Sequence, residues 1–109
     1  VLPRDAAEAA RKPSGGSWTG DVWKIIDCLI SYRPELMSTA ILAGSQPTGC
    51  LIICQPNPEN RVLENSYDEI MSKYLHPDYA LMPASHITDR VVSADVALLN
   101  LENFIKKAI

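Results

Sequence analysis

The sequence predicts a small α/β fold in which one amphipathic helix precedes a pair of antiparallel strands and further helices follow. Apolar residues recur at three- and four-residue spacing between residues 20 and 33, which is the period of a helix with one buried face. Two short apolar runs follow at residues 37–43 and 50–55, and these have the length and composition of strands. Helical spacing returns after residue 65. This order of elements is typical of an α/β domain.

The predicted helix over residues 20–33 has signals at both ends. Thr19 is available as its N-cap, and Asp21 lies in the first turn, where a carboxylate meets the positive end of the helix dipole. Pro34 ends the helix, because proline lacks an N–H and disfavours helical geometry in the residue before it. The apolar positions between these signals are Val22, Ile25, Ile26, Leu29 and Ile30.

The two apolar runs are predicted to pair as neighbouring antiparallel strands. Only residues 44–49, which include two glycines and a proline, separate them. A parallel pair would need a crossover of about a dozen residues or more. The run from Cys50 to Cys54 contains no charged residue, so we expect helices to bury it on both faces.

The last part of the chain predicts two further helices. Asn65 is expected to cap a helix that runs through about Leu75. Ser93 or Asp95 is expected to cap a second helix that continues to the end of the chain. Residues 78–92 show no decisive pattern. The apolar side of the first helix consists of Ile70, Met71, Tyr74 and Leu75, and that of the second of Ala97, Leu101, Phe104, Ile105 and Ala108.

The composition bounds the class of protein. A chain of 109 residues can form one small domain or a part of one. Its hydrophobic fraction of 47% and charged fraction of 21% are those of an ordinary soluble protein, and no apolar run approaches the roughly 20 residues that cross a bilayer. The net charge is −3 and the sequence has no basic stripe, since Arg11-Lys12 and Lys106-Lys107 are isolated pairs. We therefore expect neither a nucleic-acid partner nor a membrane partner.

The three cysteines favour a reducing compartment. Cys28, Cys50 and Cys54 form no CxxC pair and no even-numbered disulfide framework, and each lies in an apolar run where cysteine acts as a small hydrophobic residue. We therefore expect a cytoplasmic protein. The chain begins at Val1, without an initiator methionine or a signal-peptide pattern, which favours a start within a longer protein.

The first half of the chain carries a series of short motifs: Leu2-Pro3-Arg4, Trp18-Thr19, Gly20-Asp21-Val22-Trp23-Lys24, Arg33-Pro34-Glu35-Leu36 and Pro47-Thr48-Gly49. In this order they resemble the C-terminal portion of class I S-adenosylmethionine-dependent methyltransferases. The resemblance implies a Rossmann-like sheet, of which this chain holds the loop after the fifth strand, its helix, and the sixth and seventh strands. Residues 1–55 would then be the C-terminal part of the methyltransferase-like α/β domain, and residues 56–109 a helical C-terminal extension.

The same resemblance shows which part of that family's architecture is missing. Members bind S-adenosylmethionine with a Gly-rich turn after the first strand and an acidic residue at the end of the second. The pair Gly15-Gly16 and the separate Gly44 and Gly49 do not stand between a strand and a helix. We therefore expect the cofactor-binding half to lie elsewhere in a parent enzyme, and this chain alone to be inactive.

Four residues near the start of the first helix are candidate site residues, because the resemblance places this loop near the acceptor pocket. Asp21 could orient a hydroxyl or act as the catalytic base, although a role as dipole partner is the favoured alternative. Trp18, in a Gly/Ser-rich loop, could cover a substrate as part of a lid. Trp23 could bind substrate, although a residue of the core or of a domain contact is the favoured alternative. Lys24 is unfavourably placed for the dipole and is either an anion contact or a solvated lysine.

Other reactive groups form no recognisable motif. His76 and His86 lack the i, i+4 spacing of metal ligands on a helix, so no metal is predicted. No serine stands in a G-x-S-x-G motif and no cysteine in a local nucleophile signature, which argues against a hydrolase.

Two classes of function follow. In the first, the parent protein transfers a methyl group from S-adenosylmethionine to a small-molecule or glycan-like acceptor, and the main partner of this chain is the missing N-terminal half of the same domain. In the second, the chain is a small non-enzymatic α/β module that binds a partner protein through exposed Trp18 and Trp23. A chain without the first half of its sheet would expose an apolar strand edge, so self-association into homo-oligomers is also expected.

Overall fold

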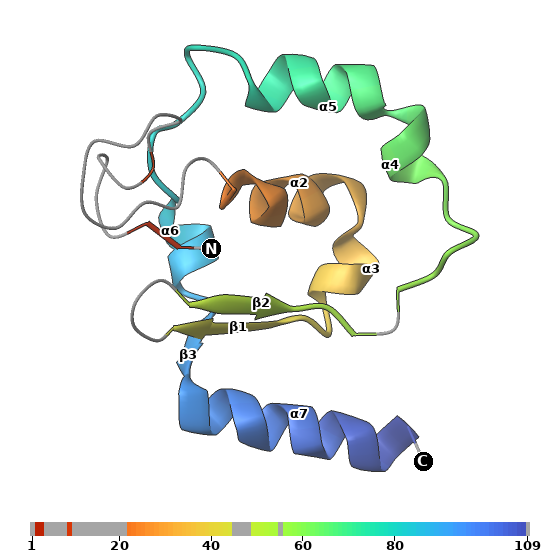
Figure 1. Ribbon diagram of the computed structural model, residues 1–109, viewed down its shortest axis with the longest axis vertical. Helices are drawn as coiled ribbons and strands as arrows, with labels where there is room; N and C mark the ends of the chain where they lie inside the picture. Colours follow the sequence, from red (N-terminus) through yellow and green to blue (C-terminus); the bar gives the residue numbers. More distant parts are fainter. Residues whose placement is uncertain (1, 4–8, 10–21, 45–48, 55, 109) are drawn as a thin grey trace.

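The protein contains a three-stranded mixed sheet. The computed structural model describes residues 2–3, 9, 22–44, 49–54 and 56–108. Within these ranges, β1 (Ile41–Gly44) pairs antiparallel with β2 (Cys50–Ile52) and parallel with β3 (Val91–Ser93), so the strand order is β2-β1-β3 (Figure 1). The expected antiparallel pair is confirmed, and the fold is a mixed α/β fold.

One face of the sheet packs against α2 (Lys24–Tyr32) and α3 (Pro34–Met37). Leu42 stands opposite Leu51 of β2 and Val91 of β3 in the strand register, and these three side chains share one core. Side chains that stand opposite each other on paired strands lie on the same face of the sheet. The buried members of this core are Ala9, Trp23, Ile26, Leu29, Leu36, Met37, Leu42 and Ile87.

The opposite face of the sheet packs against α7 (Ala94–Ala108). Ile41 and Ala43 of β1 flank Leu42 and point to this second face, because successive side chains of a strand alternate. They form a separate core with Ala97 of α7, joined by half-buried Leu101. Figure 1 shows the resulting layers, with α2 and α3 on one side of the sheet and α7 on the other.

Helix α2 ends where the sequence predicts and begins later. It starts at Lys24 instead of near residue 20, after a turn at Val22 and Trp23. At its other end, the Arg33 N–H donates to the Leu29 carbonyl at 2.8 Å, and Pro34 then opens α3 as its first residue. The predicted cap and the first-turn carboxylate, Thr19 and Asp21, lie outside the described residues.

The predicted cap of the next helix is wrong. Asn65 is the last residue of α4 (Val62–Asn65), and α5 (Tyr67–Tyr74) begins after Ser66. The helical segment starts earlier because the Asn60 side-chain oxygen accepts the Val62 N–H at 2.9 Å, which satisfies a backbone donor at the start of α4. Of the predicted apolar side of α5, Ile70 and Tyr74 are buried and Leu75 is exposed.

The undecided stretch of residues 78–92 contains α6 (Ser85–Thr88) and begins β3. A single turn of helix and a three-residue strand are too short to show periodicity in the sequence. Ile87 nevertheless anchors α6 with no exposed surface, in the core that contains Leu42. The part of the chain predicted as a helical extension, residues 56–109, thus also contributes a strand to the sheet.

The prediction that Cys50 to Cys54 is buried on both faces is wrong. Cys50 is exposed, Ile53 is 39% exposed, and Cys54 alone in this run is buried. The physical reason is position, because β2 stands at one end of the strand order β2-β1-β3. An apolar run therefore does not distinguish a central strand from an edge strand.

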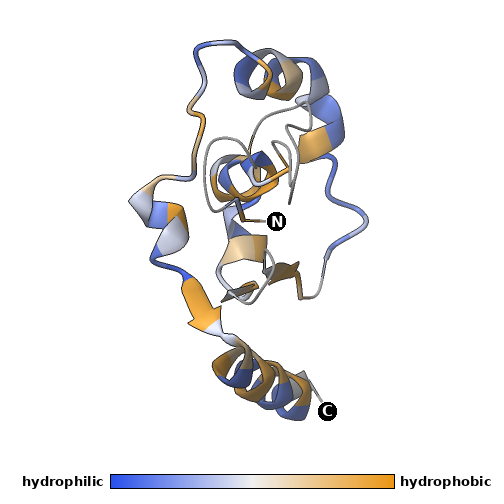
Figure 2. Ribbon diagram, turned by 60° about the vertical axis from the view of Figure 1, so that its left-hand side comes forward, coloured by the Kyte–Doolittle hydropathy of each residue, from blue (hydrophilic) through white to orange (hydrophobic). Residues whose placement is uncertain are grey.

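One of the two predicted N-caps of α7 is confirmed. The Ser93 hydroxyl oxygen accepts the Val96 N–H at 3.2 Å, which satisfies a free donor of the first turn. Figure 2 shows apolar and polar residues alternating around this helix. Ala97 on its predicted apolar side is buried and Phe104 is half-buried, whereas Ile105 is 49% exposed, and the Ala108 side chain lies outside the description.

Gly49→Ala should destabilise the fold. Gly49 precedes β2 with a φ of 78°, and an added Cβ would lie 2.6 Å from the Ala43 carbonyl oxygen. Strain in the left-handed region costs about 1–3 kcal/mol for a residue other than glycine, and the backbone clash adds to this cost. Urea unfolding followed by circular dichroism measures the loss. Glu59→Ala, in an exposed turn, is the control, and equal stability of the two variants would contradict the expectation.

Candidate functional site

The structure places two of the four predicted site residues in one group of contacting side chains. Trp23 and Lys24 meet Tyr74, at the end of α5, and Tyr79, in the following loop. Trp18 and Asp21 lie outside the described residues. We call Trp23, Tyr74 and Tyr79 the aromatic cluster.

Trp23 belongs to the interior. Its side chain is 1% exposed, and its ring centroid lies 6.1 Å from that of Tyr79 with a tilt of 34° between the planes. The expectation of an exposed Trp23 is therefore wrong, and its position matches the core alternative. The indole Nε1 is buried and has no hydrogen-bond partner among the described residues.

The Lys24 ammonium is unfavourably placed at the start of α2, and it contacts the end of a different helix instead. Its Nζ donates to the main-chain carbonyl of Tyr74 at 2.9 Å. Tyr74 is the last residue of α5, where the carbonyl groups form the negative end of the helix dipole. The ammonium also lies 5.3 Å from the Tyr79 ring centroid, within the range of a cation–π contact. Lys24 thus connects the start of α2 to the end of α5.

The aromatic cluster holds polar groups that the described residues leave unused. The Tyr74 and Tyr79 rings pack edge to face, with centroids 5.0 Å apart and an angle of 63°. The Tyr74 hydroxyl is buried and, like the Trp23 indole, finds no hydrogen-bond partner within the described parts of the chain. Most buried polar atoms in proteins are paired, so these two groups are exceptions among the described residues.

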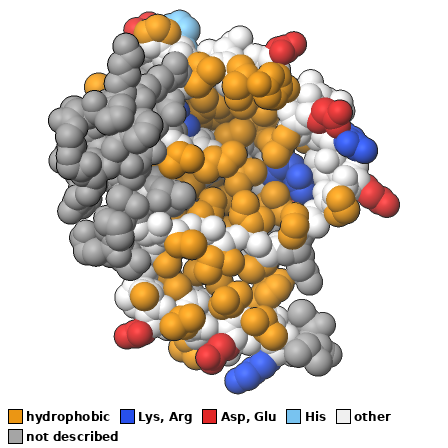
Figure 3. Space-filling view, in the orientation of Figure 1, with side chains coloured by type: hydrophobic (Ala, Val, Ile, Leu, Met, Phe, Trp, Pro, Cys, Tyr) orange, Lys and Arg blue, Asp and Glu red, His pale blue; other side chains and the backbone are white. Residues whose placement is uncertain are grey.

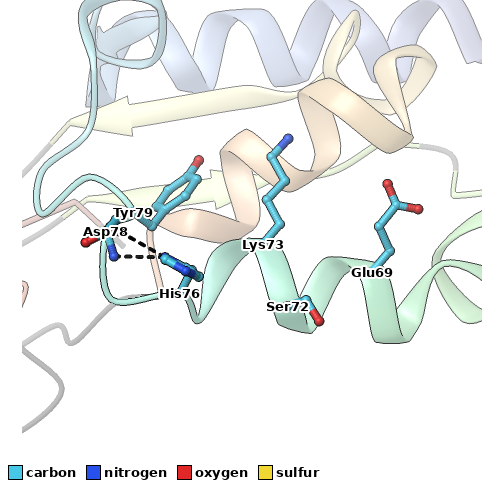
Figure 4. Close-up of a pocket in the computed structure, with 6 residues that line it drawn as sticks. All are labelled: Glu69, Ser72, Lys73, His76, Asp78 and Tyr79. Atoms are coloured by element: carbon cyan, nitrogen blue, oxygen red, sulfur yellow. Dashed lines mark hydrogen bonds and ion pairs between the residues drawn. The ribbon is translucent and has the colours of Figure 1, made fainter.

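An open hollow of about 520 Å³ adjoins the cluster at Tyr79. Its other lining residues are Glu69, Ser72, Lys73, His76 and Asp78. Figure 4 shows Lys73 and Glu69 extending to one side of α5 and Ser72 to the other. The Nδ1 of His76 accepts the Asp78 N–H at 3.1 Å and lies 3.8 Å from the Asp78 carboxylate. The arrangement does not direct the Ser72 hydroxyl toward the imidazole, so it is not that of a serine nucleophile and its base.

A second contact of α2 lies one turn beyond Lys24. Asp27 Oδ1 stands 3.3 Å from Nε2 of His86 on α6. His86 is about half exposed and Asp27 is partly buried, so this pair contributes little to stability. His76 and His86 do not come together, and no group of three His, Cys, Asp or Glu side chains among the described residues could hold a metal ion.

The thiol groups differ in exposure. All three cysteines are free; Cys28 and Cys54 are buried and Cys50 is exposed. Burial raises the pKa of the Cys28 thiol, with a smaller upward contribution from Asp27 that Lys73 opposes. Because the thiolate is the nucleophilic form, Cys28 is poorly suited to covalent catalysis.

A hydrogen bond also joins the far end of α2 to α5. The Tyr32 hydroxyl donates to Glu69 Oε1 at 2.9 Å, and this bond, with burial and the Glu69 charge, raises the pKa of Tyr32 to about 12. Close by in the chain, the Arg33 side chain donates to Glu35 and lowers the pKa of that carboxyl. Arg33 itself is buried, and its Nη2 has no partner within the described residues.

Sequence reasoning missed Tyr79 and His76 as neighbours of the predicted site. Both lie in or beside the loop after α5, about 50 residues from Lys24 in the chain. The spacing of Tyr74 and Tyr79 carries no helical or strand period that would join them to Trp23. Their contact arises only from the packing of α5 on α2.

Comparison of the chain with known protein families, curated proteins and solved structures finds no match. Within the described residues, no helix has both the length and the apolar character required to cross a membrane.

Lys24→Met should weaken the packing of α5 on α2. The variant leaves the Tyr74 carbonyl without its charged donor. Because Lys24 is partly exposed, we expect the free energy of unfolding to fall by about 1–2 kcal/mol. Urea unfolding measures this loss. Lys106→Met, at an exposed position in the last turn of α7, removes the same charge from another helix and should cost less than about 1 kcal/mol. Equal losses would contradict the assigned role of Lys24.

Tyr32 should titrate above ordinary tyrosines. The folded state holds its proton more tightly than the unfolded chain, so the Tyr32–Glu69 contact stabilises the fold fully below a pH of about 10. This stabilisation is lost as the pH rises from about 10 to about 12. The absorbance of the wild-type protein at alkaline pH, minus that of Tyr32→Phe, gives the titration of Tyr32 alone. Glu69→Gln should return its pKa toward the ordinary value, and an unchanged pKa in that variant would contradict the assignment.

Proposed function

We propose that this chain is the acceptor-side section of an S-adenosylmethionine-dependent methyltransferase that acts on a small-molecule or glycan-like acceptor. The cofactor-binding half is then supplied by the N-terminal part of the same domain. The observation that carries the proposal is the sequence of elements α2, α3, β1 and β2, in which a helix leads to an antiparallel strand pair. This is the order implied by the resemblance over residues 1–55.

Methyl transfer places limited chemical demands on such a section. The reaction is an in-line displacement, so the protein mainly holds acceptor and donor in alignment and removes a proton from the acceptor. A rigid scaffold and one base meet these demands. Helix α2 is a suitable scaffold, since it packs on the sheet side through Leu29 and on α5 through Cys28.

Among the predicted site residues, Asp21 is the one we assign to proton removal. Trp23 and Lys24 are engaged in packing α2, through the aromatic cluster and the Tyr74 carbonyl. In this proposal they position the preceding loop, while Asp21 and Trp18 contact the acceptor. The cofactor contacts belong to the other half of the domain.

S-adenosylmethionine binding tests the proposal on the parent protein. Isothermal titration calorimetry of the parent, expressed from its native reading frame, should show one site, and this chain alone should show none. With radiolabelled S-adenosylmethionine and small-molecule or glycan extracts, Asp21→Asn should reduce methyl transfer by about 10²–10⁴-fold while cofactor affinity is unchanged.

Asp27→Asn is the matched control for the Asp21 variant. It removes a carboxylate that lies six residues later in the sequence and contacts His86, so methyl transfer should persist. Absence of cofactor binding by the parent would refute the proposal. Equal activity of the Asp21 and Asp27 variants would remove Asp21 as the base.

A further inference from the structure

A hollow of about 370 Å³ lies between α7 and the connection that leads from α3 into β1. Figure 1 shows the C-terminal half of α7 passing beneath the start of β1 at this place. The α7 side of the sheet is opposite to the side that packs on α2, so the hollow is separate from Trp23 and Lys24. Its described lining residues are Ser38, Thr39, Ala40, Ile41, Asn100, Asn103, Phe104 and Lys107.

Helix α7 presents one polar and aromatic surface to the hollow. Its four lining residues follow the i, i+3, i+4, i+7 spacing that places side chains on one side of a helix. Asn100 and Asn103 are exposed, and each carboxamide offers two N–H donors and an acceptor oxygen, which suits hydroxyl groups that both donate and accept. Half-buried Phe104 offers a ring face to C–H groups. This combination suits a carbon ring that carries several hydroxyls.

The opposite wall of the hollow is held in place by hydrogen bonds. Arg90 Nη1 donates to the Met37 carbonyl at 3.4 Å, which ties the end of α3 to the residue before β3. The Ser38 hydroxyl donates to the Glu35 carbonyl at 2.8 Å, so its oxygen is oriented and still has lone pairs to accept with. Ile41 is buried against α7 in the core below. The hollow is therefore formed by structured elements on both sides.

Lys107 gives the hollow a positive charge. It is the single ionisable side chain among the described lining residues, and it is exposed. The last turn of α7 carries the negative end of the helix dipole, equivalent to about half a charge, and Lys106 and Lys107 together exceed it. The electrostatics of the hollow therefore favour a ligand with a negatively charged group.

The apolar surface elsewhere on the molecule lacks this combination. Figure 3 shows hydrophobic side chains gathered across one face, from the level of α2 and α5 to that of α7. A groove of about 190 Å³ between α2 and α5 is lined mainly by apolar side chains, and the Lys24 ammonium at its border is bound to the Tyr74 carbonyl. Ligand sites gain their specificity from a few well-placed polar groups. The hollow beside α7 has such groups, and the groove does not.

We propose that the hollow between α7 and the α3–β1 connection binds a sugar that carries one negatively charged group, either a phosphate or a carboxylate. Lys107 binds the charged group, Asn100 and Asn103 bind hydroxyls, and Phe104 packs against the C–H face of the ring. The proposal goes beyond the proposed function and does not depend on it, because none of these residues takes part in methyl transfer.

Chemical-shift titration of the isotope-labelled chain tests the proposal. The probes are glucose phosphorylated on its primary hydroxyl, glucuronate, glucose and inorganic phosphate. Amide resonances of residues 38–41 and 100–107 should shift with at least one of the two charged sugars, and the better of these identifies the anion. The Kd of glucose and that of inorganic phosphate should each be at least about tenfold higher, since each lacks one half of the contacts.

Substitutions assign the contacts. Lys107→Met should raise the Kd of the preferred sugar at least about tenfold, because it removes the charged donor. The matched control is Lys106→Met, which removes the neighbouring charge outside the hollow and should change the Kd less than about twofold in physiological salt. Asn103→Asp keeps the size of the side chain and adds a negative charge, so it should weaken binding as Lys107→Met does. Circular dichroism verifies that each variant is folded.

Three results would overturn the proposal. One is the absence of shifts at residues 38–41 and 100–107 with every probe. Another is a Kd of inorganic phosphate or of free glucose equal to that of the charged sugars, which would show that the hollow recognises only an anion or only hydroxyls. The third is an equal effect of Lys107→Met and Lys106→Met, because the charge would then act from outside the hollow.

Discussion

The fold depends on the burial of both faces of β1. This strand has only four residues, yet it is hydrogen-bonded on both sides and its alternate side chains enter different cores. Leu42 points toward α2 and α3, while Ile41 and Ala43 point toward α7. A shift of one residue in register would exchange these two sets of side chains, so the packing on each face fixes the position of the strand. The helices on the two faces are thereby coupled through one short segment.

Helix α2 connects the sheet to a further layer, which is formed by α5. One side of α2 packs toward the sheet, and Cys28 on another side meets Ile70 and Tyr74 of α5. Hydrogen bonds tie the two helices at both ends, from Lys24 to the carbonyl of Tyr74 and from Tyr32 to Glu69. The aromatic cluster forms at the first of these ends, so its geometry depends on how α5 is held against α2.

The elements with strong periodicity or a clear terminator were predictable from the sequence. Pro34 fixed the end of α2, the short turn before Cys50 implied an antiparallel pair, and Ser93 was one of two caps foreseen for α7. Elements of three or four residues, such as α6 and β3, carry too few positions to show a period. The apolar run of β2 also did not reveal an edge position, because edge and centre differ in neighbours and not in local sequence.

The candidate site was predictable only in part, for a related reason. Lys24 was recognised as unfavourably placed on its own helix, but the carbonyl that balances it belongs to Tyr74, 50 residues away. Trp23 could not be assigned to core or surface without Tyr79, which approaches it through a loop that has no regular pattern. Contacts that arise from the packing of separate elements leave little trace in local spacing.

Hydrogen exchange of the chain, followed by mass spectrometry, tests most directly whether β1 couples the two cores. The account predicts that amides of β1 exchange slowest, and that protected amides in α2 and α7 exchange with them in one cooperative opening. Exchange of α7 at a free energy far below that of α2, with β1 still protected, would show that the helix is a separate appendage and would contradict the account.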